Sequence, residues 1–189
     1  MKTKTIFAAC LLICAALLFI SEVPAEEKEK PQVQIEQKQS HAVLYTIYRG
    51  PYDAVGEAIG TLYQTAGKNG IRPAGQMHFV YLNNPRLVDS AHWLTEIRIE
   101  VGDDALKHEG KLGKWIDVKR IPPLQMAVIT KPAGIEDPSD VYLRLAQWLY
   151  ENEYYILESF QEAFGGAMTQ NYQQMETRIM VPVEKKTSN

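Results

Sequence analysis

Two stretches of similar order decide the fold: HAVLYTIYRGPYDAVGEAIGTLYQTAGKNG at residues 41–70 and QMAVITKPAGIEDPSDVYLRLAQWLYENE at residues 125–153. Each begins with a run typical of a β-strand, passes through a turn that contains glycine, and continues with apolar residues at helical spacing. The turn glycines, Gly50 and Gly134, lie 84 residues apart. The pattern therefore predicts the same strand–turn–helix order in both halves of the chain.

Signals for the ends of both helices are present. In the first half, Asn69-Gly70 ends the helix, because glycine accepts the left-handed conformation that a helix terminus often requires. In the second half, Asp137-Pro138 begins the helix with a capping side chain and a proline at the first helical position, and Glu153 stands where the first half has Gly70. The remaining strands are predicted at residues 33–37, 76–82, 94–101, 116–121, 156–163 and 175–183.

These elements form two strand–helix–strand–strand repeats, one at residues 33–101 and one at residues 115–183. Connections between the later strands are too short for a helical crossover, so the strands are expected to be antiparallel. The predicted fold class is α+β, with both helices packed on one face of the sheet.

The composition excludes several classes of protein. The chain has 189 residues, 46% of them apolar and 23% charged, with a net charge of -3. These values fit a globular domain and exclude collagen-like, coiled-coil and disordered chains. The acidic balance argues against a nucleic-acid partner, since binding to phosphates needs a basic surface.

The first 25 residues have the layout of a secretory signal peptide. Lys2 and Lys4 precede an uncharged apolar run at residues 6–20, and Val23-Pro24-Ala25 follows as a small-x-small cleavage pattern. Both cysteines lie in this leader, so the mature chain lacks thiols. We expect an exported protein, periplasmic or extracellular, with an uncleaved N-terminal membrane anchor as the alternative; beyond the leader no contact with a membrane is expected.

Polar segments flank the predicted domain, which covers residues 33–183. Residues 26–32 are charged and contain Pro31, which is typical of a linker. Residues 184–189 are polar and are expected to form a frayed C-terminal tail.

The order of the motifs resembles a known family. Arg49-Gly50-Pro51-Tyr52 opens the first helix, Tyr81-Leu82-Asn83-Asn84-Pro85 follows the next strand, and Thr95-Glu96-Ile97-Arg98-Ile99-Glu100-Val101 forms the strand after that. Together they resemble the GyrI-like small-molecule-binding domain, the effector-binding module of AraC-type and MerR-type regulators, within the SOUL-like superfamily. The resemblance covers essentially the whole predicted mature chain.

The resemblance implies a fold and a function. It implies two repeats related by a pseudo-twofold axis, with a ligand pocket in the cleft between them. In that family, aromatic side chains and an acidic residue in the cleft receive hydrophobic, often cationic, compounds. This chain departs from the family pattern at Pro132-Ala133-Gly134, where the family often repeats Gly-Pro-Tyr.

Two glutamates are candidate ligand contacts. In the last strand of each repeat, at residues 94–101 and 175–183, apolar residues alternate with polar ones, so Glu96 and Glu176 face away from the helices. In the resembled fold that face lines the cleft, where a carboxylate near aromatic rings would attract a cation. The alternative for Glu96 is a surface ion pair with Arg98.

Three aromatic residues are candidates for the same site. Tyr48, Tyr81 and Trp93 flank the motifs that carry the resemblance. The alternative for each is a place in the hydrophobic core, where aromatic residues contribute much of the buried area. Tyr52 is expected to be structural.

These observations favour a protein that binds a small hydrophobic or cationic molecule as a monomer or weak dimer. One alternative is a hydrolase of small electrophilic compounds that uses Glu96 or Glu176 as a general acid or base. Another is a haem or tetrapyrrole binder, since SOUL-type proteins have a similar fold. The four histidines lack the spacing of metal ligands, so neither a metal nor another cofactor is expected.

Overall fold

The computed structural model describes residues 32–135, 137–165 and 175–187. All of them belong to one compact unit that spans residues 31–189. The predicted leader and all of the predicted linker except Gln32 lie outside the described residues. Among the helices of the described part, none is long and apolar enough to cross a membrane.

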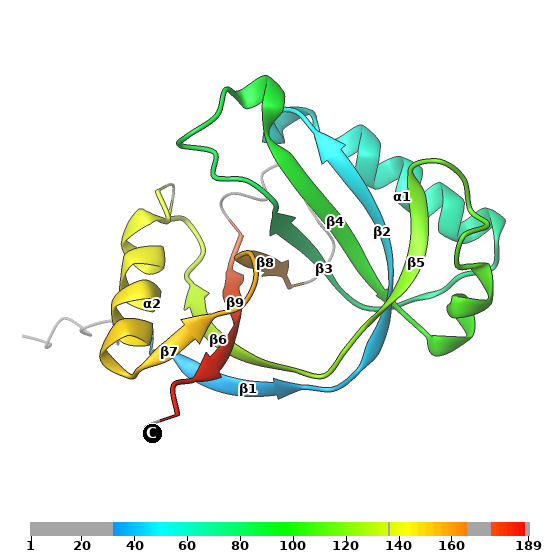
Figure 1. The fold of residues 1–189 in the computed structure, drawn as a ribbon. Coiled ribbons are helices and arrows are strands. Elements are labelled where there is room, and N and C mark those ends of the chain that lie inside the picture. The colour runs from blue at the N-terminus through cyan, green and yellow to red at the C-terminus, as the bar shows by residue number, and fades with distance from the viewer. Residues whose placement is uncertain (1–31, 136, 166–174, 188–189) are drawn as a thin grey trace, which may run out of the picture. The chain divides into compact units, whose positions relative to one another are not determined.

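The fold is α+β, as predicted, with one large antiparallel sheet and two α-helices (Figure 1). The strands of the sheet follow the order β1-β6-β9-β8-β3-β4-β2-β5, and β7 pairs with β9 off this path. The elements are β1 (Gln34–Lys38), β2 (His41–Arg49), α1 (Gly56–Lys68), β3 (Pro73–Tyr81), β4 (Leu94–Val101), β5 (Ile116–Ile121), β6 (Leu124–Lys131), α2 (Ser139–Glu151), β7 (Tyr154–Ile156), β8 (Gln161–Phe164) and β9 (Thr177–Lys185).

The two halves exchange their leading strands. β1 begins the first half but pairs with β6, and β5 begins the second half but pairs with β2. The halves also meet at the centre of the sheet, where β3 pairs with β8 and Phe79 lies opposite Glu162. Three separate strand pairings therefore connect the halves.

Each helix packs through one apolar face. Leu62 and Ala66 of α1 are buried in a core with Phe79 of β3. Leu145 and Leu149 of α2 are buried in a second core that lies over β6 and β9. Full burial of a leucine side chain contributes roughly 1.5–3 kcal/mol, so these faces fix both helices on the sheet.

The strand predicted at residues 156–163 is two strands, β7 and β8. Both pair with β9, with Ile156 opposite Val183 and Gln161 opposite Met180. Four residues separate Ile156 from Gln161, but only two separate their partners, so the chain carries two extra residues here. Such an irregularity bends a strand and redirects its side chains.

The turn after each helix has the same backbone geometry. Gly70 has φ of 66° and Glu153 has φ of 55°, both in the left-handed region. Glycine enters this region without cost, whereas a residue with a Cβ atom does not. The second half thus uses a strained residue where the first half uses glycine.

The start of α2 is stabilised by Asp137. Its Oδ1 atom accepts hydrogen bonds from the backbone N–H of Ser139 at 2.9 Å and from the Ser139 hydroxyl at 2.5 Å. The predicted start is wrong by one residue: Pro138 is the N-cap, not the first helical residue, and Asp137 acts from the position before the cap.

Candidate ligand-binding site

A buried carboxyl group lies where the two halves meet. Glu162 belongs to β8, next to β3 at the centre of the sheet, and is 8% exposed. Its side chain points to the face that carries the helices, because it contacts Tyr142 of α2 while Phe164, two residues further, packs in the core beside α1. Burying a carboxyl group is costly unless it is well partnered, so its surroundings indicate its role.

Two tyrosine hydroxyls, one from each half, donate hydrogen bonds to Glu162. The Tyr142 hydroxyl lies 2.8 Å from Oε1 of Glu162. Tyr81, at the end of β3, is the second donor. Burial and the nearby charge of Glu162 raise the pKa of both tyrosines well above the usual value, so both remain protonated donors at neutral pH.

Further aromatic rings pack against the rings of these two tyrosines. The ring of Tyr52 lies 5.7 Å from that of Tyr81 in an edge-on arrangement and 4.6 Å from that of Trp93. On the other side, the Phe160 ring lies 5.6 Å from Tyr142. We call Glu162 together with these five rings the aromatic–carboxylate cluster; it consists of Tyr52, Tyr81, Trp93, Tyr142, Phe160 and Glu162.

Burial dominates the electrostatics of the cluster and raises the pKa of Glu162. The hydrogen bonds from Tyr142 and Tyr81, and the positive charge of Lys131, act in the opposite direction. Lys131 ends β6 and is itself buried, with its Nζ donating to the carbonyl oxygen of Met175 at 2.8 Å. A cation placed against Glu162 would favour the ionised carboxylate in the same way.

The structure brings some of the residues predicted from the sequence into this cluster and places others elsewhere. Tyr81 and Trp93 belong to it, and so does Tyr52, which was expected to be structural. The Tyr48 hydroxyl instead donates to the carbonyl oxygen of Pro51 at 3.0 Å, inside the turn before α1. Glu176 is exposed immediately before β9.

Glu96 lies in β4 on the other face of the sheet, and its carboxylate is already paired with positively charged side chains of the protein. It is 5% exposed and forms ion pairs with Arg98 and with Lys119, whose Nζ lies 2.7 Å from Oε1. The same Nζ lies 4.2 Å from the centre of the Tyr45 ring. The combination of carboxylate, aromatic ring and cation that the sequence suggested for Glu96 is present, with the protein's own lysine as the cation.

Sequence reasoning missed Glu162, Tyr142 and Phe160. A signal for Glu162 exists in Phe160-Gln161-Glu162-Ala163-Phe164, where a single carboxylate shares a strand face with two phenylalanines. That signal requires the correct start of β8, which the predicted strand at residues 156–163 obscured.

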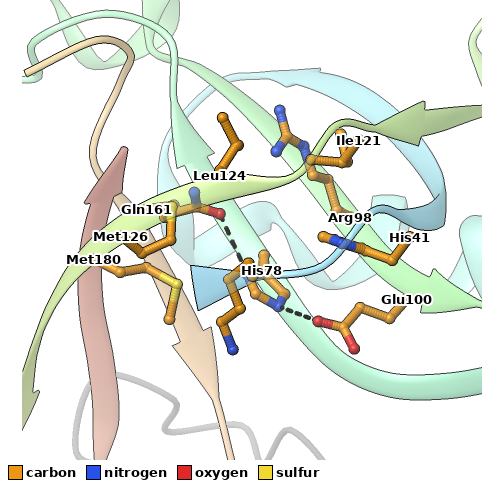
Figure 2. Close-up of a pocket in the computed structure, with 10 residues that line it drawn as sticks. His41, His78, Arg98, Glu100, Ile121, Leu124, Met126, Gln161 and Met180 are labelled. Carbon is orange, nitrogen blue, oxygen red and sulfur yellow. Dashed lines mark hydrogen bonds and ion pairs between the residues drawn. The ribbon is translucent and has the colours of Figure 1, made fainter. Parts of the chain in front are cut away.

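A small cavity with both polar and apolar walls lies on the face of the sheet opposite the cluster; Figure 2 shows the residues that line it. His78 stands at its centre, with Nε2 donating to Glu100 at 3.1 Å and Nδ1 3.3 Å from Oε1 of Gln161. The hydrogen bond from His78 is the largest effect that lowers the pKa of Glu100. Lys38 and Arg98 are among the other residues that line the cavity.

This cavity is too small for an organic ligand. Its volume of about 20 Å³ is room for roughly one water molecule. Within the part of the chain that the structure describes, no group of three or more His, Cys, Asp or Glu side chains is arranged to hold a metal ion. The aromatic–carboxylate cluster is therefore the better candidate for recognition of a small molecule.

Comparison with known proteins gives a family match over part of the chain. Residues 13–101 match the family model of the GyrI-like small molecule binding domain. No curated protein sequence matches the chain.

Solved structures share the fold. The crystal structure of the EcmrR C-terminal domain has a TM-score of 0.68 and 19% identity, and the match covers 82% of this chain and 99% of that one. The cryo-EM structure of EcmrR in a complex with DNA has a TM-score of 0.68 and 18% identity, and the match covers 82% of this chain and 58% of that one. The crystal structure of a hydrolase encoded by lin2189 from Listeria innocua has a TM-score of 0.61 and 13% identity, and the match covers 82% of this chain and 93% of that one.

Proposed function

We propose that this chain, which matches the GyrI-like family model over residues 13–101 and shares the fold of the EcmrR C-terminal domain, binds a small hydrophobic cation at the aromatic–carboxylate cluster between its two halves. The observation that carries the proposal is the buried Glu162, which has tyrosine donors from both halves and aromatic rings around them. With a net charge of -3 the chain offers little attraction for nucleic acid, so the proposed partner is the small molecule.

The chemistry of the cluster suits a cation with apolar substituents. Aromatic faces attract a cation through their quadrupoles by about 0.5–2 kcal/mol each, more when water is excluded. The carboxylate of Glu162 supplies a full negative charge in the same place. Its hydrogen bonds from Tyr81 and Tyr142 leave less capacity for N–H donors, so a cation recognised by its charge and its apolar surface fits best.

Titration calorimetry with a defined probe tests the proposal. Tetraphenylphosphonium serves as the cation and triphenylphosphine oxide as an uncharged molecule of similar shape. We expect the protein to bind the cation and to bind the neutral compound at least about tenfold more weakly, which corresponds to roughly 1.4 kcal/mol.

Glu162→Gln is the decisive variant. It keeps the size of the side chain and can still accept hydrogen bonds from the tyrosines, but it removes the charge. We expect affinity for the cation to fall at least about tenfold, and affinity for the neutral compound to change little. The matched control is Glu184→Gln, which removes an exposed carboxylate of β9 outside the cluster. Equal losses in both variants, or no loss in Glu162→Gln, would contradict the proposal.

A second candidate function is hydrolysis of small electrophilic compounds. It is favoured by one observation: burial raises the pKa of Glu162, and two tyrosine hydroxyls contact the same group. A carboxyl group with a raised pKa is suited to act as a general acid. Incubation of the wild-type protein and Glu162→Gln with styrene oxide separates the two functions, because only a hydrolase yields the diol, and only with Glu162 present.

We also propose that the domain is exported through the leader at residues 1–25. The uncharged apolar run at residues 6–20 after Lys2 and Lys4 supports this. The mass of the protein recovered from the periplasm or the medium tests it, because cleavage after Ala25 removes both cysteines.

A further inference from the structure

The loop at residues 82–93, which joins β3 to β4, is closed at its base by one side chain. The Asn83 amide nitrogen donates to the carbonyl oxygen of His92 at 2.8 Å, and its oxygen accepts from the backbone N–H of Leu94 at 3.0 Å. The loop thus starts from a fixed base beside the aromatic–carboxylate cluster.

One end of the loop is attached to the cluster through Trp93. The indole N–H of Trp93 contacts the carbonyl oxygens of Pro85 and Val88 at 3.2 and 3.1 Å. The same indole ring packs on Tyr52, which packs on Tyr81. The shape of the loop is therefore linked to Tyr81, one of the two tyrosines that donate to Glu162.

The outer part of the loop reaches the other half of the molecule through Arg86. Its Nη2 donates to the Ser139 hydroxyl oxygen at 2.5 Å, and that hydroxyl donates to Asp137. Ser139 begins α2, and Tyr142 lies three residues further on the same face of the helix. Arg86 is thus connected to the segment that carries Tyr142, the other tyrosine donor.

These contacts form a strap between the two donors of Glu162. One end of the strap contacts Tyr81 through the rings of Trp93 and Tyr52. The other end reaches the helix turn that carries Tyr142 through the hydrogen bond between Arg86 and Ser139. Because Glu162 is 8% exposed, a ligand that contacts it must displace some of the groups that cover it, and displacement of Tyr81 away from Tyr142 would stretch the strap.

We propose that Arg86 is a positioning residue that latches the strap across the junction of the two halves and so sets how fast a ligand enters and leaves the cluster. The inference rests on the proposed function for the identity of the ligand, but it also makes a claim about the free protein. A latch that must open for both entry and exit changes both rates and leaves their ratio nearly unchanged.

Surface plasmon resonance with immobilised full-length protein and tetraphenylphosphonium measures both rates. In Arg86→Met, which keeps an apolar stem but lacks the hydrogen-bond donors, we expect both rate constants to rise at least threefold and Kd to change less than twofold. The control is Arg144→Met, which removes an exposed positive charge from α2 and leaves both rates unchanged. Ser139→Ala should reproduce the effect, and the double variant should add nothing further.

A merely structural role would give a different result. General weakening of the fold lowers affinity and thermal midpoint together and does not raise the rate of entry. Rates in Arg86→Met that equal those of Arg144→Met would overturn the inference, and so would a rise in the rate of exit alone.

Hydrogen exchange in the ligand-free protein separates this inference from the proposed function. The backbone N–H of Tyr142 bonds to the carbonyl oxygen of Pro138 at 3.1 Å in the first turn of α2. If Arg86 holds this turn in place, the Tyr142 amide exchanges faster in Arg86→Met than in Arg144→Met. If the wild-type protein binds no cation, the proposed function fails while the exchange result still decides on the latch; equal exchange overturns it.

Discussion

At the scale of single residues, the carboxyl group of Glu162 meets two opposing demands. Without a ligand, burial favours its neutral form, and the tyrosine hydroxyls and Lys131 only partly offset this effect. With a cation in contact, the ionised form is favoured. Ligand affinity is therefore coupled to the proton on this one side chain.

This coupling predicts a pH dependence with a definite sign. The pKa of Glu162 is raised in the folded protein, so the carboxyl group holds a proton below that raised value and loses it above. Affinity for tetraphenylphosphonium should therefore rise as the pH increases through the raised pKa, and level off above it. Calorimetry at several pH values between 5 and 8 measures this, and the profile of Glu162→Gln should be flat over the same range.

The same proton affects stability in the opposite direction. A carboxyl group with a raised folded pKa stabilises the fold fully below its unfolded pKa, and this contribution is lost as the pH rises through the folded value. Glu162→Gln avoids the cost of a buried charge. The free energy of unfolding of Glu162→Gln at pH 7 should accordingly be at least that of the wild type. Residues that serve a binding site often lower the stability of the fold in this way.

Single residues also show why only part of the cluster could be predicted. Tyr81 and Trp93 lie beside recognisable motifs in the sequence, so their proximity to a site could be inferred. Glu96 and Glu162 look alike in sequence, since each is a carboxylate in an apolar strand. Only the fold shows that Lys119 arrives from β5 to neutralise Glu96, while tyrosines converge on Glu162.

At the scale of elements, the ends of the helices were the most predictable features. Glycine and asparagine after α1 and aspartate before α2 act through local backbone geometry, which depends on a few neighbouring residues. The division between β7 and β8 was not predictable in this way, because the register of both strands is set by pairing with β9, whose partner residues lie further along the chain than any local pattern extends.

The turn after α2 yields a prediction about stability. Glu153 holds φ of 55°, a conformation that costs a side-chain-bearing residue roughly 1–2 kcal/mol. Glu153→Gly removes this cost but adds conformational freedom to the unfolded chain. We expect a net gain of about 0.5–1 kcal/mol in the free energy of unfolding, measured by urea denaturation. Gly70→Ala, at the matching turn after α1, should lose about 1 kcal/mol; a loss in both variants would contradict the explanation.

At the scale of the whole molecule, the exchange of leading strands joins the halves. β1 completes the sheet of the second half and β5 that of the first, and β3 joins β8 between them. The predicted repeats at residues 33–101 and 115–183 are therefore units of sequence order whose leading strands each pair with the other half. Local patterns identified the strands, but they contain no information on which half each leading strand joins.

This arrangement predicts that the halves depend on each other. A fragment of residues 32–113 would leave β1 without β6, and a fragment of residues 114–187 would leave β5 without β2. Each would also expose the edge of β3 or β8, which invites aggregation. We expect neither fragment alone to unfold cooperatively in circular dichroism. A dispersed NMR spectrum from either fragment would show that one half is an independent unit.

The ion pair on the other face of the sheet has a consequence for how new binding sites can arise. Lys119 places its ammonium group against the carboxylate of Glu96 and over the ring of Tyr45, so the molecule contains a receptor for an alkylammonium group that its own side chain fills. Shortening that one side chain would vacate the receptor without altering its walls. A single substitution at residue 119 would thus turn a structural ion pair into a carboxylate and an aromatic ring that a primary amine from outside could contact.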